Sequence, residues 1–161
     1  MNIFGYALQI EKEAEAYYRS LAGGSDIEGL RRIFNWLADE ELKHYHKFKE
    51  LQKDEVSPLQ ETTILSDAKK EFEKIKAAQK HYHFDNSQVE LYLKAQGLEQ
   101  KSMDFYIKKS HEAQGGNQKE IFLKIAEEEK RHYFLLDNII EFVRRPERWL
   151  ENAEFNHLDE Y

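Results

Sequence analysis

Apolar residues recur every three or four positions through most of the chain, and this spacing predicts helices that each bury one face. The clearest stripe runs through Leu30, Phe34, Leu37, Glu41, His44, Phe48 and Leu51. A second stripe runs through Phe122, Ile125, Glu129, His132, Leu136, Ile139 and Val143. Each stripe carries a glutamate followed three residues later by a histidine. Because residues three apart share a helix face, both pairs are predicted to point into the core.

The same spacing predicts four long helices that form two hairpins. They cover about residues 2–22, from a cap at Ser25 to about 53, about 88–113, and from a cap at Asn117 to about 144. Ser25, Ser87 and Asn117 each precede a glutamate by three residues, which is typical of a capping box. Since the loop within each hairpin is short, its two helices are expected to lie antiparallel.

Residues 54–86 are predicted to cross from one hairpin to the other. The stretch 54–65 has no helical period, and Ser66 is expected to cap a modest helix over about 67–82. The apolar face of that helix is thin, so we expect it to be peripheral. His81 and His83 have no third metal ligand in register, and we interpret them as a solvated pair.

The stretch 145–161 is predicted to be a tail with one short helix, because Pro146 suits a first helical turn. Trp149 and Phe155 need apolar surroundings. They are expected to pack either over one end of the bundle or against a partner subunit, and the sequence favours neither.

Segments 37–45 and 125–133 are copies of one sequence. Five of their nine positions are identical, namely Ala38/Ala126, Glu40/Glu128, Glu41/Glu129, His44/His132 and Tyr45/Tyr133. The offset of 88 residues also relates Glu11 to Glu99 and Tyr18 to Tyr106. We therefore interpret residues 1–161 as a single all-α domain, a four-helix bundle built from a duplicated hairpin.

Each hairpin supplies a lone glutamate from its first helix and a Glu-x-x-His pair from its second. The six residues are Glu11, Glu41, His44, Glu99, Glu129 and His132. A buried charge without a partner costs about several kcal/mol, and these stripes carry no lysine or arginine. Two divalent cations would balance four carboxylates, as in the di-iron or di-manganese sites of four-helix bundles. The same ligands suit iron, manganese or mixed occupancy.

Two tyrosines and two further glutamates lie near these six residues in the sequence. Tyr18 and Tyr106 either pack in the core or donate hydrogen bonds to ligand carboxylates. Glu40 and Glu128 are expected to be solvated, because their helical phase points away from the apolar stripe.

The composition of the chain excludes several classes of function. The net charge of −7 argues against binding nucleic acid or an anionic membrane surface. The absence of cysteine excludes disulfides, cysteine-ligated metals and thiol catalysis. No N-terminal targeting pattern occurs, and no run approaches the roughly 20 apolar residues of a membrane span. A cytoplasmic location is the default expectation.

The segments that carry the six residues resemble the rubrerythrin-like branch of the ferritin-like superfamily. These segments are 11–18, 37–44, 99–106 and 125–132, and 146–155 is similar to the tail of single-domain members. The resemblance covers nearly the whole chain. It implies a ferritin-like four-helix bundle with a di-iron site.

The resemblance also implies a role for each ligand: Glu41 and Glu129 bridging, Glu11 and Glu99 terminal, and His44 and His132 on one metal each. This chain differs from full rubrerythrins in two ways. It lacks the cysteines of their rubredoxin domain, and Ser102 stands where they carry an extra carboxylate. Both differences bear on peroxidase activity and leave the six ligands unchanged.

Three functions are expected from this resemblance and from the ligand set. The first is a di-iron oxidoreductase that reacts with peroxide or dioxygen and takes electrons from an external donor protein. The alternatives are a ferroxidase or iron-handling protein of ferritin type, and a non-enzymatic helical module with a structural metal. Because the crossover is long enough for hairpins to exchange between chains, we also predict a homodimer, whose hairpins are either swapped or not.

Overall fold

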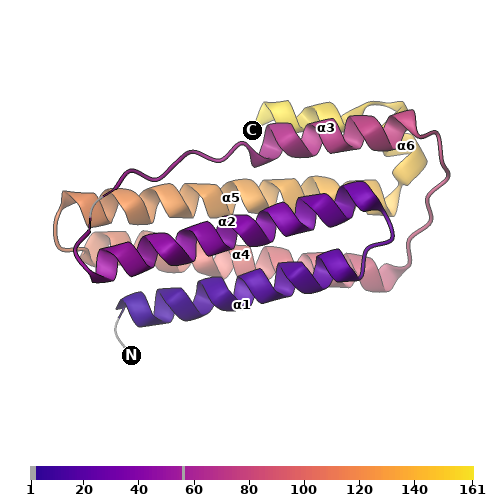
Figure 1. The fold of residues 1–161 in the computed structure, drawn as a ribbon. Coiled ribbons are helices and arrows are strands. Elements are labelled where there is room, and N and C mark those ends of the chain that lie inside the picture. The colour runs from indigo at the N-terminus through magenta and orange to yellow at the C-terminus, as the bar shows by residue number, and fades with distance from the viewer. Residues whose placement is uncertain (1–2, 56) are drawn as a thin grey trace.

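The computed structural model describes residues 3–55 and 57–161 (Figure 1). These residues form α-helices and one 3-10 helix, and the described part contains no strand. The elements are α1 (Ile3–Gly23), α2 (Glu28–Gln52), α3 (Ile64–Ala77), α4 (Asn86–Glu112), α5 (Gly116–Arg144), α6 (Pro146–Glu151) and η1 (Glu154–Glu160).

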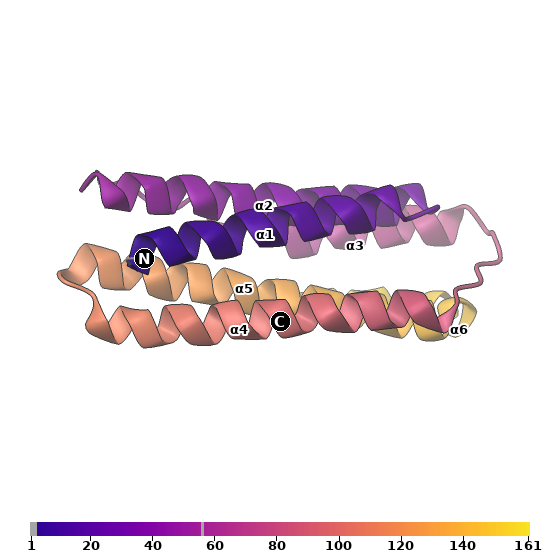
Figure 2. The same cartoon turned by 90° about the horizontal axis from the view of Figure 1, so that it is seen from below.

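The four long helices pack as two antiparallel hairpins, α1 with α2 and α4 with α5. Figure 2 shows the hairpins as two layers, one above the other. The shorter α3 lies outside this bundle and packs against α2 and α5, on the side opposite α1 and α4 (Figure 1). The all-α four-helix bundle predicted from the apolar spacing is therefore confirmed. None of the helices among the described residues is long and apolar enough to cross a membrane.

The predicted capping boxes were wrong, although the helices they were meant to open exist. The first residue of α2 is Glu28, and the Ser25 hydroxyl donates to the Ile27 carbonyl oxygen at 3.3 Å. The Asp85 carboxylate caps α4, accepting from the backbone N–H of Ser87 at 3.0 Å. A charged carboxylate is a stronger acceptor than the serine hydroxyl we expected in this role.

The start of α5 also differs from the prediction at Asn117. Its N-cap is Gly115, whose φ of 98° lies in the left-handed region that favours glycine. The chain therefore turns into α5 by backbone freedom at a glycine, and no side chain provides a cap hydrogen bond.

The third helix is shifted relative to its predicted range of about 67–82. It begins at Ile64, with Thr63 at the N-cap, and ends at Ala77. His81 and His83 are therefore in a loop, where both are exposed as expected of a solvated pair. The apolar face is larger than predicted, because the side chains of Ile64, Ala68, Phe72 and Ile75 are all buried.

The C-terminal tail packs onto this apolar face of α3. Trp149 is 1% exposed, and its ring centroid lies 4.6 Å from that of Phe72 and 5.6 Å from that of Phe142. Phe155 contacts the same indole at 5.8 Å. Of the two explanations left open for Trp149 and Phe155, the structure therefore has them covering part of their own chain.

The apolar core consists of two clusters along the length of the bundle. One lies toward the end that α3 and the tail cover, and includes Phe34, Phe72 and Phe142. The other lies toward the opposite end and includes Phe48 and Phe122. The polar residues described below lie on the same helices between these two clusters.

Replacing Trp149 by alanine should remove the contact that holds the tail, α3 and α5 together. We expect the Trp149→Ala variant to lose about 3–5 kcal/mol of unfolding free energy, the usual cost of a large buried aromatic side chain. The exposed Leu123, 41% accessible, provides a control, and Leu123→Ala should change stability by less than about 0.5 kcal/mol. Urea unfolding of both variants measures the difference. Equal losses would contradict the packing of the tail.

Candidate metal centre

Six ionisable side chains meet in the middle of the bundle, and each is at most 2% exposed. They come from four helices: Glu11 from α1, Glu41 and His44 from α2, Glu99 from α4, and Glu129 and His132 from α5. All six residues singled out in the sequence are thus brought together by the fold. Their role as metal ligands stays a prediction.

The six side chains form two overlapping groups of four. One group is Glu11, Glu41, His44 and Glu129, and the other is Glu41, Glu99, Glu129 and His132. Within each group, one ligand atom from every residue lies within 4.8 Å of the others. Only Glu41 and Glu129 belong to both groups, so their carboxylates stand where they can serve two neighbouring ions.

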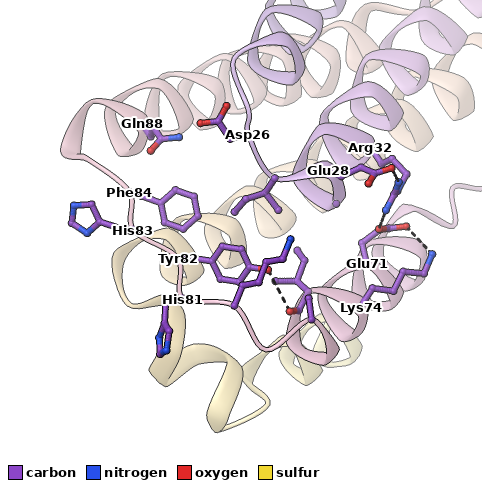
Figure 3. A pocket seen from close by; sticks show the side chains of 15 residues that line it. Asp26, Glu28, Arg32, Glu71, Lys74, His81, Tyr82, His83, Phe84 and Gln88 are labelled. Carbon is purple, nitrogen blue, oxygen red and sulfur yellow. Dashed lines mark hydrogen bonds and ion pairs between the residues drawn. The ribbon is translucent and has the colours of Figure 1, made fainter.

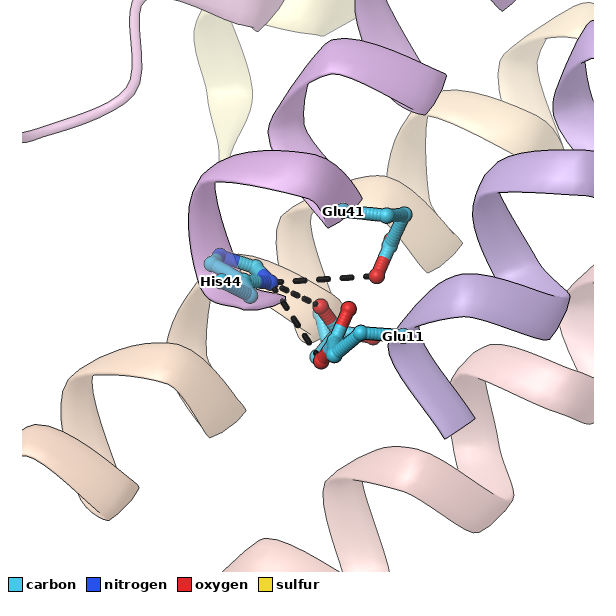
Figure 4. Close-up of side chains that lie close together, drawn as sticks. Glu11, Glu41 and His44 are labelled. Atoms are coloured by element: carbon cyan, nitrogen blue, oxygen red, sulfur yellow. Dashed lines mark ion pairs between the residues drawn. The ribbon is translucent and has the colours of Figure 1, made fainter. Parts of the chain in front are cut away.

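The first group is arranged around the Nδ1 atom of His44 (Figure 4). This nitrogen lies 2.9 Å from Glu129 Oε1, 3.6 Å from Glu11 Oε1 and 3.7 Å from Glu41 Oε2. The carboxylates therefore converge on one side of the imidazole from three different helices.

The second group repeats this arrangement around His132. Its Nδ1 atom lies 3.0 Å from Glu41 Oε1, 3.4 Å from Glu99 Oε1 and 3.9 Å from Glu129 Oε1. The two imidazoles are nearly parallel, with centroids 6.1 Å apart. The sequence duplication thus has a counterpart in the geometry, an approximate twofold relation between the groups.

Among the described residues, each of the six keeps one buried atom that makes no hydrogen bond, although two of these atoms form the 2.9 Å ion pair between His44 and Glu129. These atoms are Glu11 Oε2, Glu41 Oε2, His44 Nδ1, Glu99 Oε2, Glu129 Oε1 and His132 Nε2. Buried polar atoms in proteins are nearly always hydrogen-bonded, so a cluster of atoms without hydrogen bonds indicates a further partner such as a cation. Carboxylate oxygens and imidazole nitrogens are donors that suit iron and manganese. The residues present therefore fit a pair of such ions.

Two tyrosines hold the lone carboxylates in place. The Tyr18 hydroxyl on α1 donates to Glu99 Oε1 on α4 at 2.5 Å, and the Tyr106 hydroxyl on α4 donates to Glu11 Oε1 on α1 at 2.6 Å. Burial and the neighbouring carboxylates raise the pKa of both tyrosines well above its usual range. Both phenols therefore keep their protons and act as donors, which decides between the two interpretations made from the sequence.

The expectation that Glu40 and Glu128 are solvated was wrong. Glu128 is 4% exposed, and its Oε1 lies 2.7 Å from His44 Nε2. Glu40 accepts a hydrogen bond from Thr62 and lies 3.6 Å from His132 Nε2. Their helical phase does point away from the apolar stripe, but it directs them to the adjacent helix of the other hairpin. Their identity in both sequence copies was the signal that sequence reasoning missed.

These two outer carboxylates are held in the charged form. Burial opposes ionisation of Glu40, yet contacts with His132 and Thr62 lower its pKa to about 2. Burial likewise opposes ionisation of Glu128, and the neighbouring His44 lowers its pKa. A carboxylate against the far nitrogen of a ligand histidine fixes the tautomer and ring orientation.

The inner carboxyl groups titrate as a coupled cluster. Burial first, and then the charge of Glu41, raise the pKa values of Glu11, Glu99 and Glu129. Burial also opposes ionisation of Glu41, but hydrogen bonds from neighbours that include Glu11 lower its pKa well below the usual range. Without metal, Glu11, Glu99 and Glu129 therefore bind a proton more tightly than an ordinary carboxyl group does, and Glu41 binds one less tightly.

The surrounding carboxylates raise the pKa values of both histidines. Burial alone would lower their pKa values, but the charges of Glu11 near His44 and of Glu99 near His132 raise them well above the usual range. Without metal, both imidazoles therefore bind a proton more tightly in the folded protein than in the unfolded chain.

The Ser102 side chain makes a local contact on α4. Its hydroxyl donates to the Leu98 carbonyl oxygen of its own helix at 3.0 Å. A small cavity, with room for the centre of about one water-sized molecule (about 10 Å³), lies between Ser102, Ala14, Glu99 and Glu129. No seventh carboxylate enters the centre from this position.

A larger surface pocket of about 570 Å³ lies away from the six residues (Figure 3). Its buried carboxylate, Glu71, is already paired with Arg32 at 2.9 Å and with Lys74 at 3.3 Å. The Glu71 carboxylate thus has cationic partners within the pocket itself.

Comparison with protein families gives one match. The rubrerythrin family profile matches residues 2–140, which include all six side chains of the centre. The chain belongs to the rubrerythrin family. Searches of curated proteins and of solved structures give no match. Membership in the rubrerythrin family implies iron binding, and the buried glutamate and histidine groups are suited to hold the metal.

The metal-free protein should lose stability as pH rises. The three carboxyl groups with raised pKa values hold protons more tightly when folded, so their penalty grows above the unfolded value of about 4.3. The histidines contribute stability that is complete below their unfolded pKa of about 6.5 and is lost as pH rises through the folded value. Glu40, Glu41 and Glu128 have lowered pKa values and act in the opposite direction, but their contribution is already complete above the unfolded value.

Metal binding requires deprotonated ligands and so strengthens as pH rises. We expect the difference in melting temperature between iron-loaded and metal-free protein to be larger at about pH 7–8 than at about pH 5. Calorimetry of both forms across this range measures it, and the exposed-site variant Glu13→Gln should show the same widening. A difference that stays constant with pH would contradict a buried metal site.

Proposed function

We propose that this chain is a di-iron oxidoreductase that reacts with peroxide or dioxygen, using electrons from a separate donor protein. The observation that supports this most is the burial of six glutamate and histidine side chains in two groups that share Glu41 and Glu129. Two divalent ions would neutralise the four inner carboxylates. Iron is the metal implied by the family, and manganese or mixed occupancy suits the same ligands.

In this proposal, Glu41 and Glu129 bridge the ions, because only they belong to both groups. Glu11 and Glu99 are terminal ligands, each fixed by a tyrosine from the opposite hairpin. His44 and His132 hold one ion each. Iron, when bound, would supply the redox chemistry, because reduction of hydrogen peroxide to two water molecules takes two electrons and two protons.

The remaining residues prepare the site for that chemistry. The apolar clusters on both sides exclude bulk water, which strengthens the electrostatic interactions inside. The tyrosine hydroxyls and outer carboxylates hold the ligands before metal binds. Because the chain has no cysteine, it carries no rubredoxin-type centre, and the proposal assigns electron delivery to another protein.

The homodimer also stays a prediction. All six side chains of the centre come from one chain, so the site does not require hairpins exchanged between two chains. Sedimentation at micromolar concentration tests whether a dimer forms.

The proposed activity is tested by loading the protein anaerobically with Fe(II) and adding hydrogen peroxide or dioxygen in separate experiments. We expect about two irons per chain, by the two groups of ligands, and rapid oxidation seen as a new near-ultraviolet absorption. Oxidation should stop at about two irons per chain until a reductant is added. Continued oxidation of excess Fe(II), with mineral formed inside a large shell, would instead identify a ferritin-type protein. Iron content without any oxidation would indicate a structural metal.

Ligand roles are tested by comparing Glu41→Ala with His44→Ala. Because Glu41 belongs to both groups, its loss should empty both metal positions, whereas loss of His44 should mainly weaken one. Iron per chain is measured after gel filtration, with Glu13→Ala on the exposed side of α1 as control. Equal metal loss from the two ligand variants would contradict the bridging role.

A further inference from the structure

Lys43 lies just outside the metal centre, between the two outer carboxylates. Its Nζ atom is 3.1 Å from Glu40 Oε2 on its own helix and 3.1 Å from Glu128 Oε1 on α5. The same ammonium group donates to the Gln60 carbonyl oxygen at 3.2 Å. Its side chain is 28% exposed, so the charge is partly withdrawn from water.

Through these contacts, one lysine joins the surroundings of both histidines. Glu128 Oε1 is the atom that lies 2.7 Å from His44 Nε2. Glu40 Oε1 lies 3.6 Å from His132 Nε2. The resulting chain of contacts runs in the order His132, Glu40, Lys43, Glu128, His44. It connects the two halves of the centre on the side away from α1 and α4.

The duplicated hairpin does not repeat this arrangement. The residue that corresponds to Lys43 at the offset of 88 is Arg131. Its guanidinium lies 5.3 Å from the centre of the Tyr161 ring, which also packs on Phe134 at 5.2 Å. Arg131 is thus engaged with the C-terminal residue, and Lys43 provides the cation for both outer carboxylates.

Charge balance explains why a cation is needed there. The four inner carboxylates would be neutralised by two divalent ions, which leaves Glu40 and Glu128 as two further negative charges close to each other. In partly buried surroundings, like charges repel strongly because water screens them poorly. The ammonium group at 3.1 Å from both attracts each of them and offsets one of the two charges.

We propose that Lys43 is a positioning residue of the metal centre, holding Glu40 and Glu128 against the histidines and limiting the negative charge beside the two ions. The inference uses the proposed function only in taking iron as the bound metal. Replacing Lys43 by a neutral residue leaves the outer carboxylates without their cation. That change makes the surroundings of the ions more negative and so favours Fe(III) over Fe(II).

Three variants separate the charge of Lys43 from its bulk and from a general effect of losing a cation. Lys43→Met removes the charge and keeps much of the apolar stem, and Lys43→Arg keeps the charge. Arg131→Met is the matched control, because it makes the same kind of change at the duplicated position of the other hairpin. If Lys43→Met does not fold, Lys43→Gln replaces it.

The first measurement uses metal-free protein. At neutral pH, Lys43→Met should melt at least about 3 °C below Arg131→Met, since each kcal/mol corresponds to about 2–4 °C in a chain of this size. Lys43→Arg should melt near the wild type. Equal melting temperatures for Lys43→Met and Arg131→Met would overturn the proposal, and this result does not depend on any iron chemistry.

The second measurement is the midpoint potential of the iron-loaded protein, followed optically during reductive titration. Lys43→Met should have a lower potential than the wild type, with Lys43→Arg and Arg131→Met close to it. Loss of iron from Lys43→Met that Lys43→Arg restores would also support the positioning role. A shift of equal size in Lys43→Met and Lys43→Arg would overturn it. Because neither measurement requires turnover of peroxide or dioxygen, failure of the proposed activity would be recognised separately.

Discussion

Six ionisable side chains are buried together in the middle of the helical bundle. Each would cost about several kcal/mol if left unpaired, so the surrounding residues are arranged to compensate. Tyrosines donate to the lone carboxylates, and outer carboxylates contact the far nitrogens of the histidines. The apolar clusters on both sides supply the stability that allows this polar layer to exist.

The contacts that support the centre cross from one hairpin to the other. Tyr18 of the first hairpin holds Glu99 of the second, and Tyr106 of the second holds Glu11 of the first. The contact between His44 and Glu128 follows the same rule. Each hairpin by itself therefore carries ligands without their supports, and docking of the hairpins completes both groups together.

The crossover segment breaks the twofold relation between the halves. Thr62 donates to Glu40, while Lys43 and Lys47 of α2 donate to the backbone carbonyls of Gln60 and Ser57. No duplicate of this segment covers the second hairpin, because the crossover occurs once in the chain. The two histidines thus have similar inner surroundings and different outer ones, with 2.7 Å to Glu128 and 3.6 Å to Glu40.

The apolar spacing and the duplication were enough to predict the bundle and the six inner residues. An apolar stripe with helical spacing places every residue on it in the core, and the constant offset of 88 pairs the polar ones. Helix ends were less predictable, because several groups compete for each cap, as at Asp85 and Gly115. The surroundings of Glu40 and Glu128 could not be predicted, because they depend on how the helices pack. Helical phase gives a side chain's direction on its own helix, but the position of the neighbouring helix decides whether water or a histidine lies there.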